Sequence, residues 1–147
     1  MRLATTAVAV AAIAIGVTSV LAQQDPIAER QKLMKANGAQ AKIGVAMTKG
    51  ETPFDLAKAK KIFVTFEEAA QKMPALFPEN SKTGEKTRAS PKIWDDMADV
   101  KAKFEKLGKD SKAAEASVTD LATFKTAFAE IGKDCGGCHK AYRLEKK

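Results

Sequence analysis

Apolar residues recur every three or four positions along four segments of this 147-residue chain, and no other feature constrains its fold as strongly. Alternation of β-branched residues is absent, and Ala, Lys, Glu and Leu dominate these segments. Each segment therefore predicts an amphipathic helix with one buried face. The expected buried positions are, segment by segment, Ile27, Arg30, Met34, Asn37, Ala41 and Val45; Leu56, Ala59, Phe63, Phe66, Ala70 and Met73; Ile93, Met97, Val100, Phe104 and Leu107; and Leu121, Phe124, Phe128, Ile131, Cys135, Cys138 and Tyr142.

Capping residues, glycines and prolines predict where these helices begin and end. An acid followed by proline suits a helix start, and a glycine or proline suits its end. The expected starts are Asp25-Pro26, a position within Thr52–Asp55, Ser90-Pro91 and a position near Thr119; the expected ends are near Gly50 and at Pro74, and Gly108 leaves the end of the third helix open.

Helices with seams of this spacing pack at small angles to one another. The sequence therefore predicts an all-α fold, an antiparallel up-down-up-down four-helix bundle in which the short first joint makes the first two helices neighbours. The segment between Pro74 and Ser90 is longer and polar, with Pro78 and Gly84 inside it. It is expected to be a surface loop rather than a domain boundary.

The last helical segment carries Cys135-Gly136-Gly137-Cys138-His139, which holds both cysteines and the only histidine of the chain. Two thiols three residues apart followed by an imidazole are the attachment signature of a c-type haem. The sulfurs reach the two vinyl groups of one porphyrin edge, and the histidine supplies a nitrogen to the iron. A structural zinc site needs four ligands, and this chain has three Cys and His residues in all. A thiol–disulfide role remains as the alternative.

The first residues predict export. Met1-Arg2 is a short positive start, an apolar run from Leu3 to Leu21 follows, and Val20-Leu21-Ala22 places small residues at a cleavage site. We therefore expect a signal peptide over residues 1–22, a mature domain over 23–147 and a periplasmic protein with no stable membrane association after cleavage. An uncleaved anchor is the alternative, because the run is near the lower length limit for a membrane span.

The charge balance indicates the kind of partner. Without Arg2 the chain has 24 basic and 18 acidic residues, a net charge of +6, and residues 132–147 hold five basic and two acidic side chains. For an exported haem protein this favours redox partner proteins with acidic patches. No basic motif interleaved with aromatic residues supports nucleic-acid binding.

Bundle geometry limits the residues that could be a second iron ligand. In the predicted bundle the start of the first helix lies beside the end of the last, so His139 and Met34 each lie about 10–12 Å from the same end. Met47 is about 20 Å further along the first helix and is excluded. Met73 and Met97 could also lie at the level of the haem, so geometry alone leaves three candidates.

The whole segment after residue 22 resembles the cytochrome c-prime superfamily, the class II c-type cytochromes. The motifs that carry this resemblance are Arg30-Gln31, Lys49-Gly50 followed by Pro53-Phe54-Asp55, Pro91-Lys92-Ile93-Trp94, and Cys135 to His139 followed by Tyr142-Arg143. Residues 31–38, QKLMKANG, look most like the low-spin cytochrome c556 branch, in which a methionine of the first helix is the sixth iron ligand. Residues 74–77, PALF, lack the tryptophan that many high-spin members have there.

The resemblance implies one covalent haem c with Met34 as the sixth ligand and Arg143 beside the proximal haem face. Arg143 could instead be a solvated cation at the helix end. Arg30 lies one turn before Met34, where a haem propionate could pair with it, or it could lie at the bundle edge with a buried stem. Many relatives dimerise through the first two helices, so a homodimer is a candidate assembly. Trp94 and Tyr142 are expected to be core residues rather than electron relays.

With both axial positions of the iron filled, no open site is left for a substrate, and we expect an electron-transfer protein rather than an enzyme. Two alternatives stay open. One is a high-spin cytochrome c-prime that binds nitric oxide or carbon monoxide, with Met34 packed against an open iron face. The other is a haem-free exported thiol–disulfide protein.

Overall fold

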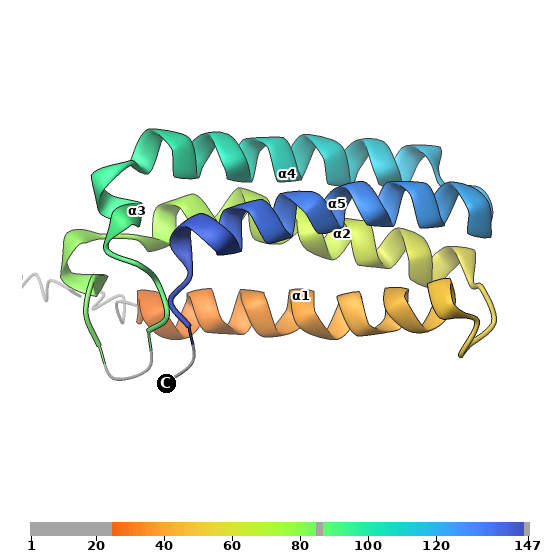
Figure 1. The fold of residues 1–147 in the computed structure, drawn as a ribbon, viewed down its shortest axis with the longest axis horizontal. Helices are drawn as coiled ribbons and strands as arrows, with labels where there is room; N and C mark the ends of the chain where they lie inside the picture. Colours follow the sequence, from red (N-terminus) through yellow and green to blue (C-terminus); the bar gives the residue numbers. More distant parts are fainter. Residues whose placement is uncertain (1–24, 85–86, 146–147) are drawn as a thin grey trace, which may run out of the picture.

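The computed structural model describes residues 25–84 and 87–145, so the predicted signal peptide at 1–22 lies outside the described residues. Its helices are, in chain order, α1 (Pro26–Lys49), α2 (Leu56–Lys72), the 3-10 turns η1 (Met73–Leu76) and η2 (Glu79–Ser81), the one-turn α3 (Lys92–Asp95), α4 (Met97–Ser117) and α5 (Leu121–Tyr142). The four long helices α1, α2, α4 and α5 lie side by side with alternating direction, which confirms the predicted antiparallel bundle (Figure 1).

Local capping explains most helix boundaries. The carboxylate of Asp25 accepts a hydrogen bond from the Ile27 N–H at 2.9 Å, with proline at the first helical position, and α1 ends at Gly50 with φ 75°. Only a residue without a side chain adopts that left-handed conformation freely. Asp55 caps α2, and Asp120 caps α5 in a reciprocal capping box. The expected starts of α1, α2 and α5 and the expected ends of α1 and α2 therefore agree with the structure to within about two residues.

The third predicted helix is interrupted, which the sequence pattern did not indicate. It starts as α3 but breaks at Asp96, whose backbone angles of φ −135° and ψ 57° are not helical. The Asp96 carboxylate then accepts a hydrogen bond from the Asp99 N–H at 3.2 Å and caps α4. The new helix continues through Gly108 to Ser117. A Cβ on Gly108 would meet Ala70 at 3.5 Å, so α2 and α4 pack closely at this glycine.

The core consists of two apolar clusters along the bundle. The first cluster comprises Met47, Ala59, Ile62, Phe63, Phe66, Ala70, Leu107, Ala114, Val118, Phe124 and Ile131. The second cluster comprises Met73, Ile93, Val100, Phe104 and Tyr142. Most expected buried positions of the last three stripes belong to these clusters or pack against them, and α5 contributes to both.

Two expected buried positions were wrong, and both lie near the α1–α2 joint. Val45 and Leu56 are each 38% exposed, whereas Gly44 and Met47 are buried in place of Val45. On the buried face of α1, the position after Ala41 is Gly44, three residues on, and not Val45, because Gly44 faces the ring of Phe128. A side chain at that position would not fit without movement of the ring.

The segment between Pro74 and Ser90 is more than the surface loop that we expected. It contains the two 3-10 turns, and the side chains of Ser81 and Ser90 are 1% and 6% exposed. The described residues of this segment, 74–84 and 87–90, are therefore folded against the bundle. Among the helices within 25–84 and 87–145, none is both long enough and apolar enough to cross a membrane.

We predict that Gly44→Ala destabilises the protein relative to Gly108→Ala. A Cβ on Gly44 would lie 2.5 Å from Cε2 of Phe128, whose ring is stacked on Phe124 at 5.2 Å. Both substitutions gain the same helix propensity, so their difference isolates the steric cost, which should be about 1–3 kcal/mol. Thermal or urea unfolding of the two variants measures it. Equal stabilities would show that Phe128 moves aside freely.

Candidate haem site

The predicted attachment motif lies on the last two turns of α5. Cys135, Cys138 and His139 are all partly buried, and the two cysteines form no disulfide with each other. Cys135 packs against the first cluster and Cys138 against the second. The motif therefore sits where the two halves of the core meet, on the face that α5 turns toward the bundle.

Burial controls the protonation of both thiols. It raises the pKa of Cys135, and the charges of Asp134 and Cys138 raise this pKa further. Burial also raises the pKa of Cys138, and the positive charge of Lys103 partly offsets this rise. A redox-active dithiol needs a lowered thiol pKa. The environment therefore disfavours the thiol–disulfide alternative.

The only imidazole of the chain is held in its neutral form. Burial lowers the pKa of His139, and the charges of Arg143 and Arg88 lower it further. The Arg143 NH1 nitrogen lies 3.4 Å from Nδ1 of His139, which places Arg143 beside the predicted ligand. A neutral imidazole is the form that binds a metal. Burial and the two arginines thus favour the neutral imidazole that can bind a metal.

The end of α5 is fastened by backbone pairing that the sequence pattern did not predict. The Ser90 N–H donates to the Tyr142 carbonyl at 2.9 Å, and the Leu144 N–H donates to the Arg88 carbonyl at 2.8 Å. Arg88 also donates through Nε and NH2 to the Leu144 carbonyl at 3.0 and 2.8 Å. These bonds begin one turn after His139 and fix the helix end that carries it.

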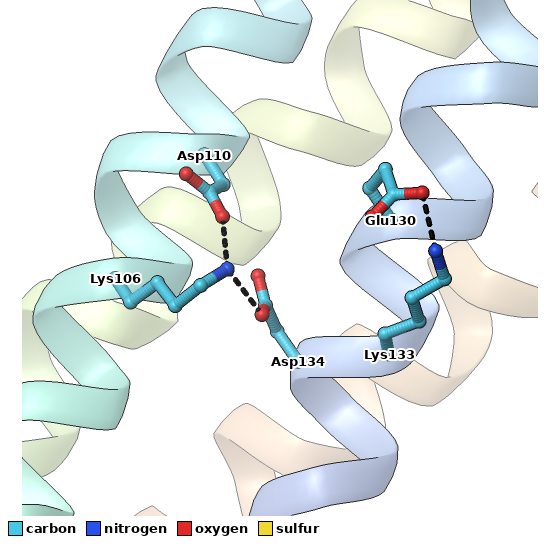
Figure 2. A network of polar contacts seen from close by, with 5 residues as sticks. All are labelled: Lys106, Asp110, Glu130, Lys133 and Asp134. Carbon is cyan, nitrogen blue, oxygen red and sulfur yellow. Dashed lines mark hydrogen bonds and ion pairs between the residues drawn. The ribbon is translucent and has the colours of Figure 1, made fainter.

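A second fastening lies on the other side of the motif, between α4 and α5. Figure 2 shows the Lys106 ammonium between two carboxylates, at 2.5 Å from Asp110 and 2.6 Å from Asp134. These hydrogen bonds raise the pKa of Lys106. Asp134 directly precedes Cys135 and is only 12% exposed. The Lys106–Asp134 pair therefore ties the start of the attachment motif to α4. In the same view, the Lys106–Asp110 pair lies within α4 and the Glu130–Lys133 pair within α5.

Met34 lies on α1 at the same end of the bundle as the motif. It is half-buried and packs against the second cluster, as does Cys138. Met97 is also half-buried there, whereas Met73 is 1% exposed and enclosed within the cluster. Met47, which the bundle geometry excluded as a ligand, is buried in the first cluster. The structure therefore brings Met34 and the attachment motif to one part of the core.

The polar and sulfur-bearing groups near the attachment motif fit a c-type haem. One turn from Met34, the side-chain oxygen of Asn37 is buried and lacks a hydrogen-bond partner within the described part of the chain. Two half-buried thiols, a neutral imidazole and a half-buried thioether complete a donor set that matches a c-type haem.

Arg30 is buried, but its partners differ from the expected haem propionate. Its NH1 donates to the Leu76 carbonyl and to the Ser81 hydroxyl, and its NH2 donates to the Ser81 carbonyl and to the Thr87 hydroxyl. Both terminal nitrogens of Arg30 therefore donate hydrogen bonds to the segment after α2. A propionate would have to use Nε or displace one of these partners. The alternative of an edge arginine with only its stem buried is wrong, because the residue is 6% exposed.

The two aromatic residues singled out as core residues pack as expected. Tyr142 is 8% exposed in the second cluster, and its hydroxyl donates to Asp99 at 2.5 Å. Trp94 packs edge to face on Phe77 at 5.7 Å, and its indole N–H donates to the Phe77 carbonyl at 2.9 Å.

An antiparallel helical bundle with this motif on its last helix defines a class of c-type haem proteins. Comparison with known proteins narrows the class. A family model described as Cytochrome C′ matches residues 25–143. Cytochrome c′ of Rhodopseudomonas palustris is 37% identical over 134 residues, covering 91% of this chain and 92% of that protein. Cytochrome c-556 of the same organism is 35% identical over 142 residues, covering 94% and 95%.

Solved structures give the same result. The structure of cytochrome c′ from Rhodopseudomonas palustris matches with a TM-score of 0.82 at 38% identity, covering 85% of this chain and 100% of that chain. Oxidised cytochrome c556 from the same organism matches with a TM-score of 0.78 at 35% identity over the same shares. The chain belongs to the cytochrome c′ family, whose members are electron-transfer or gas-binding haem proteins and not enzymes. It carries one covalently bound c-type haem.

We predict that Tyr142 titrates late, because its hydrogen bond to Asp99 raises the pKa of Tyr142 to about 12. It is the only tyrosine, so ring-labelled NMR reports it alone. In Asp99→Asn the pKa should fall toward about 10, whereas Asp95→Asn, at an exposed acid, should leave it unchanged. Since the folded pKa lies above the unfolded value, the stability from this bond is lost as pH rises from about 10 through 12. A wild-type titration near 10 would contradict the bond.

Proposed function

We propose that this chain is a low-spin electron-transfer cytochrome of the periplasm, in which Cys135 and Cys138 attach the haem and His139 and Met34 are its axial ligands. The observation that carries this proposal is the placement of Met34. Met34, on α1, is half-buried and packs against the same cluster as Cys138 of the attachment motif on α5. Met73 is less suited to the role, because protein atoms enclose it.

The haem, when bound, supplies a one-electron couple, and the chain sets its environment. Burial and two nearby arginines keep the His139 imidazole neutral for coordination. The positive charges of Arg88 and Arg143 also favour the reduced, ferrous iron, because it carries one positive charge fewer than ferric iron. A thioether from Met34 would also favour the reduced iron and a low-spin configuration. We therefore propose that both effects raise the reduction potential.

The attachment itself is directly testable. Each thiol would add across one vinyl group and form a thioether. A proteolytic peptide that contains both Cys135 and Cys138 should therefore retain the haem after acid–acetone treatment. Recovery of the haem free of this peptide would contradict the assignment. The periplasmic location is supported by the signal peptide predicted for residues 1–22.

A second candidate function is gas binding by a high-spin haem, with Met34 packed over an open iron face. The comparisons favour keeping it, because the chain is as similar to cytochrome c′ as to cytochrome c-556, at 37% and 35% identity. The choice between the two branches depends on one bond, that between the Met34 sulfur and the iron.

The charge of the attachment end supports a redox partner with an acidic patch. Lys133, Lys140 and Arg143 are exposed there. Electron transfer to such a partner should slow as ionic strength rises, and a rate that ignores salt would contradict this. For a homodimer, the support is a set of exposed apolar side chains on α1 and at the start of α2, which are Ile43, Val45 and Leu56. Sedimentation as a monomer at all concentrations would exclude it.

We predict that Met34→Ala converts the iron to a high-spin, five-coordinate state that binds carbon monoxide. The substitution removes the sulfur ligand, so the near-infrared sulfur-to-iron band should disappear and the reduction potential should fall. The bundle should still fold, at a cost of about 2–5 kcal/mol for the truncated side chain. Absorption spectra and potentiometry measure these effects.

Met97→Ala is the matched control, because Met97 is half-buried against the same cluster. It should keep the sulfur band. A band that survives Met34→Ala but is lost in Met97→Ala or Met73→Ala would place the ligand elsewhere. A wild-type spectrum that is already high-spin would select the gas-binding candidate.

A further inference from the structure

Arg30 is a buried cation whose hydrogen-bond acceptors all come from one segment of the chain. Its guanidinium makes four hydrogen bonds, to the Leu76 carbonyl at 2.5 Å, the Ser81 hydroxyl at 2.8 Å, the Ser81 carbonyl at 3.0 Å and the Thr87 hydroxyl at 3.4 Å. The guanidinium carbon also lies 4.7 Å from the centre of the Phe77 ring. Every one of these groups lies between α2 and α3.

These partners are neutral, which makes this site unusual for a buried charge. None of the four acceptors is a carboxylate. Burial lowers the pKa of Arg30, and the charge of Asp25 opposes this shift. A planar guanidinium can satisfy several fixed acceptors and an aromatic face together, whereas a lysine ammonium cannot. The arrangement therefore depends on the shape of the arginine as well as on its charge.

The held segment, residues 76–81, reaches the part of the core that contains Met34. Leu76, Phe77 and Trp94 pack against the second cluster, as Met34 does. The Trp94 indole N–H donates to the Phe77 carbonyl and to the Pro78 carbonyl at 2.9 and 3.2 Å, so it fastens the same segment from α3. Arg30 itself is one helical turn from Met34.

We propose that Arg30 is a positioning residue that holds residues 76–81 against the Met34 side of the bundle and so limits access to that side. This rests on the proposed haem site, but it applies whether Met34 is the sixth ligand or only packs over the iron. It also differs from the propionate role expected from the sequence, because the terminal nitrogens are committed to residues 76–87.

The test uses the holoprotein and three variants of α1. Arg30→Gln removes the charge and most of the donors, Arg30→Lys keeps the charge without the fork, and Lys32→Gln removes an exposed cation of the same helix. Amide hydrogen exchange of residues 76–82 should rise on the order of tenfold or more in both Arg30 variants. It should stay at the wild-type rate in Lys32→Gln, and α4 peptides provide an internal reference in each sample.

The second measurement is carbon monoxide association with the ferrous protein, made for every variant in the Met34→Ala background so that the iron has an open position whichever role Met34 has. It should become severalfold faster in Arg30→Gln and Arg30→Lys and remain unchanged in Lys32→Gln. Ser81→Ala tests the same contact from its other partner, because it removes one acceptor and leaves Arg30 intact. Its effect on exchange should be smaller and should not add to that of Arg30→Gln, because both act on one contact.

The outcomes are distinct. Unchanged exchange in Arg30→Gln, wild-type exchange in Arg30→Lys, or additive effects with Ser81→Ala would each overturn the holding role. Faster exchange with unchanged carbon monoxide association would overturn the link to the Met34 side. Failure of the proposed axial ligand is seen separately, in the spectrum of Met34→Ala, and the exchange experiment still decides the role of Arg30.

Discussion

Burial of one face of α5 against both halves of the core is the constraint on which the rest of the structure depends. Phe124 and Ile131 belong to the first cluster and Tyr142 to the second. Because a helical face cannot turn independently of its neighbours, these anchors fix the orientation of Cys135 and Cys138 between them. The position of the candidate haem site is thus a consequence of ordinary helix packing, and its chemistry needs no separate scaffold.

Local features of the fold could be predicted from the sequence, and long-range features could not. Asp25 and Gly50 bound a helix through groups within a few residues of each other, so their pattern is visible in the chain itself. The exposure of Val45 depends instead on a neighbouring helix, because Gly44 and not Val45 meets the ring of Phe128. Propensity and periodicity carry no information on such contacts.

The candidate site divides in the same way. The attachment motif consists of five consecutive residues, so the sequence alone reveals it. The geometry of the predicted bundle indicates that Met34 lies at the same level. The ion pair of Lys106 with Asp134 joins residues 28 apart, and the partners of Arg30 lie 46 or more positions away. Polar and charged residues are frequent on every helix surface of this chain, so no spacing rule selects these pairs. The sequence therefore predicts candidate haem-binding groups but not the long-range contacts that hold them.

The backbone pairing between residues 88–90 and 142–144 has a consequence for the order in which the molecule assembles. It closes a loop of more than fifty residues, a large entropic cost for a few hydrogen bonds. That cost falls once α4 and α5 have paired, because their antiparallel packing brings the two segments together. The end of the bundle that carries His139 should therefore be completed last during folding and open first under stress. Whether this end of the bundle is intact would therefore indicate whether the α4–α5 hairpin has formed.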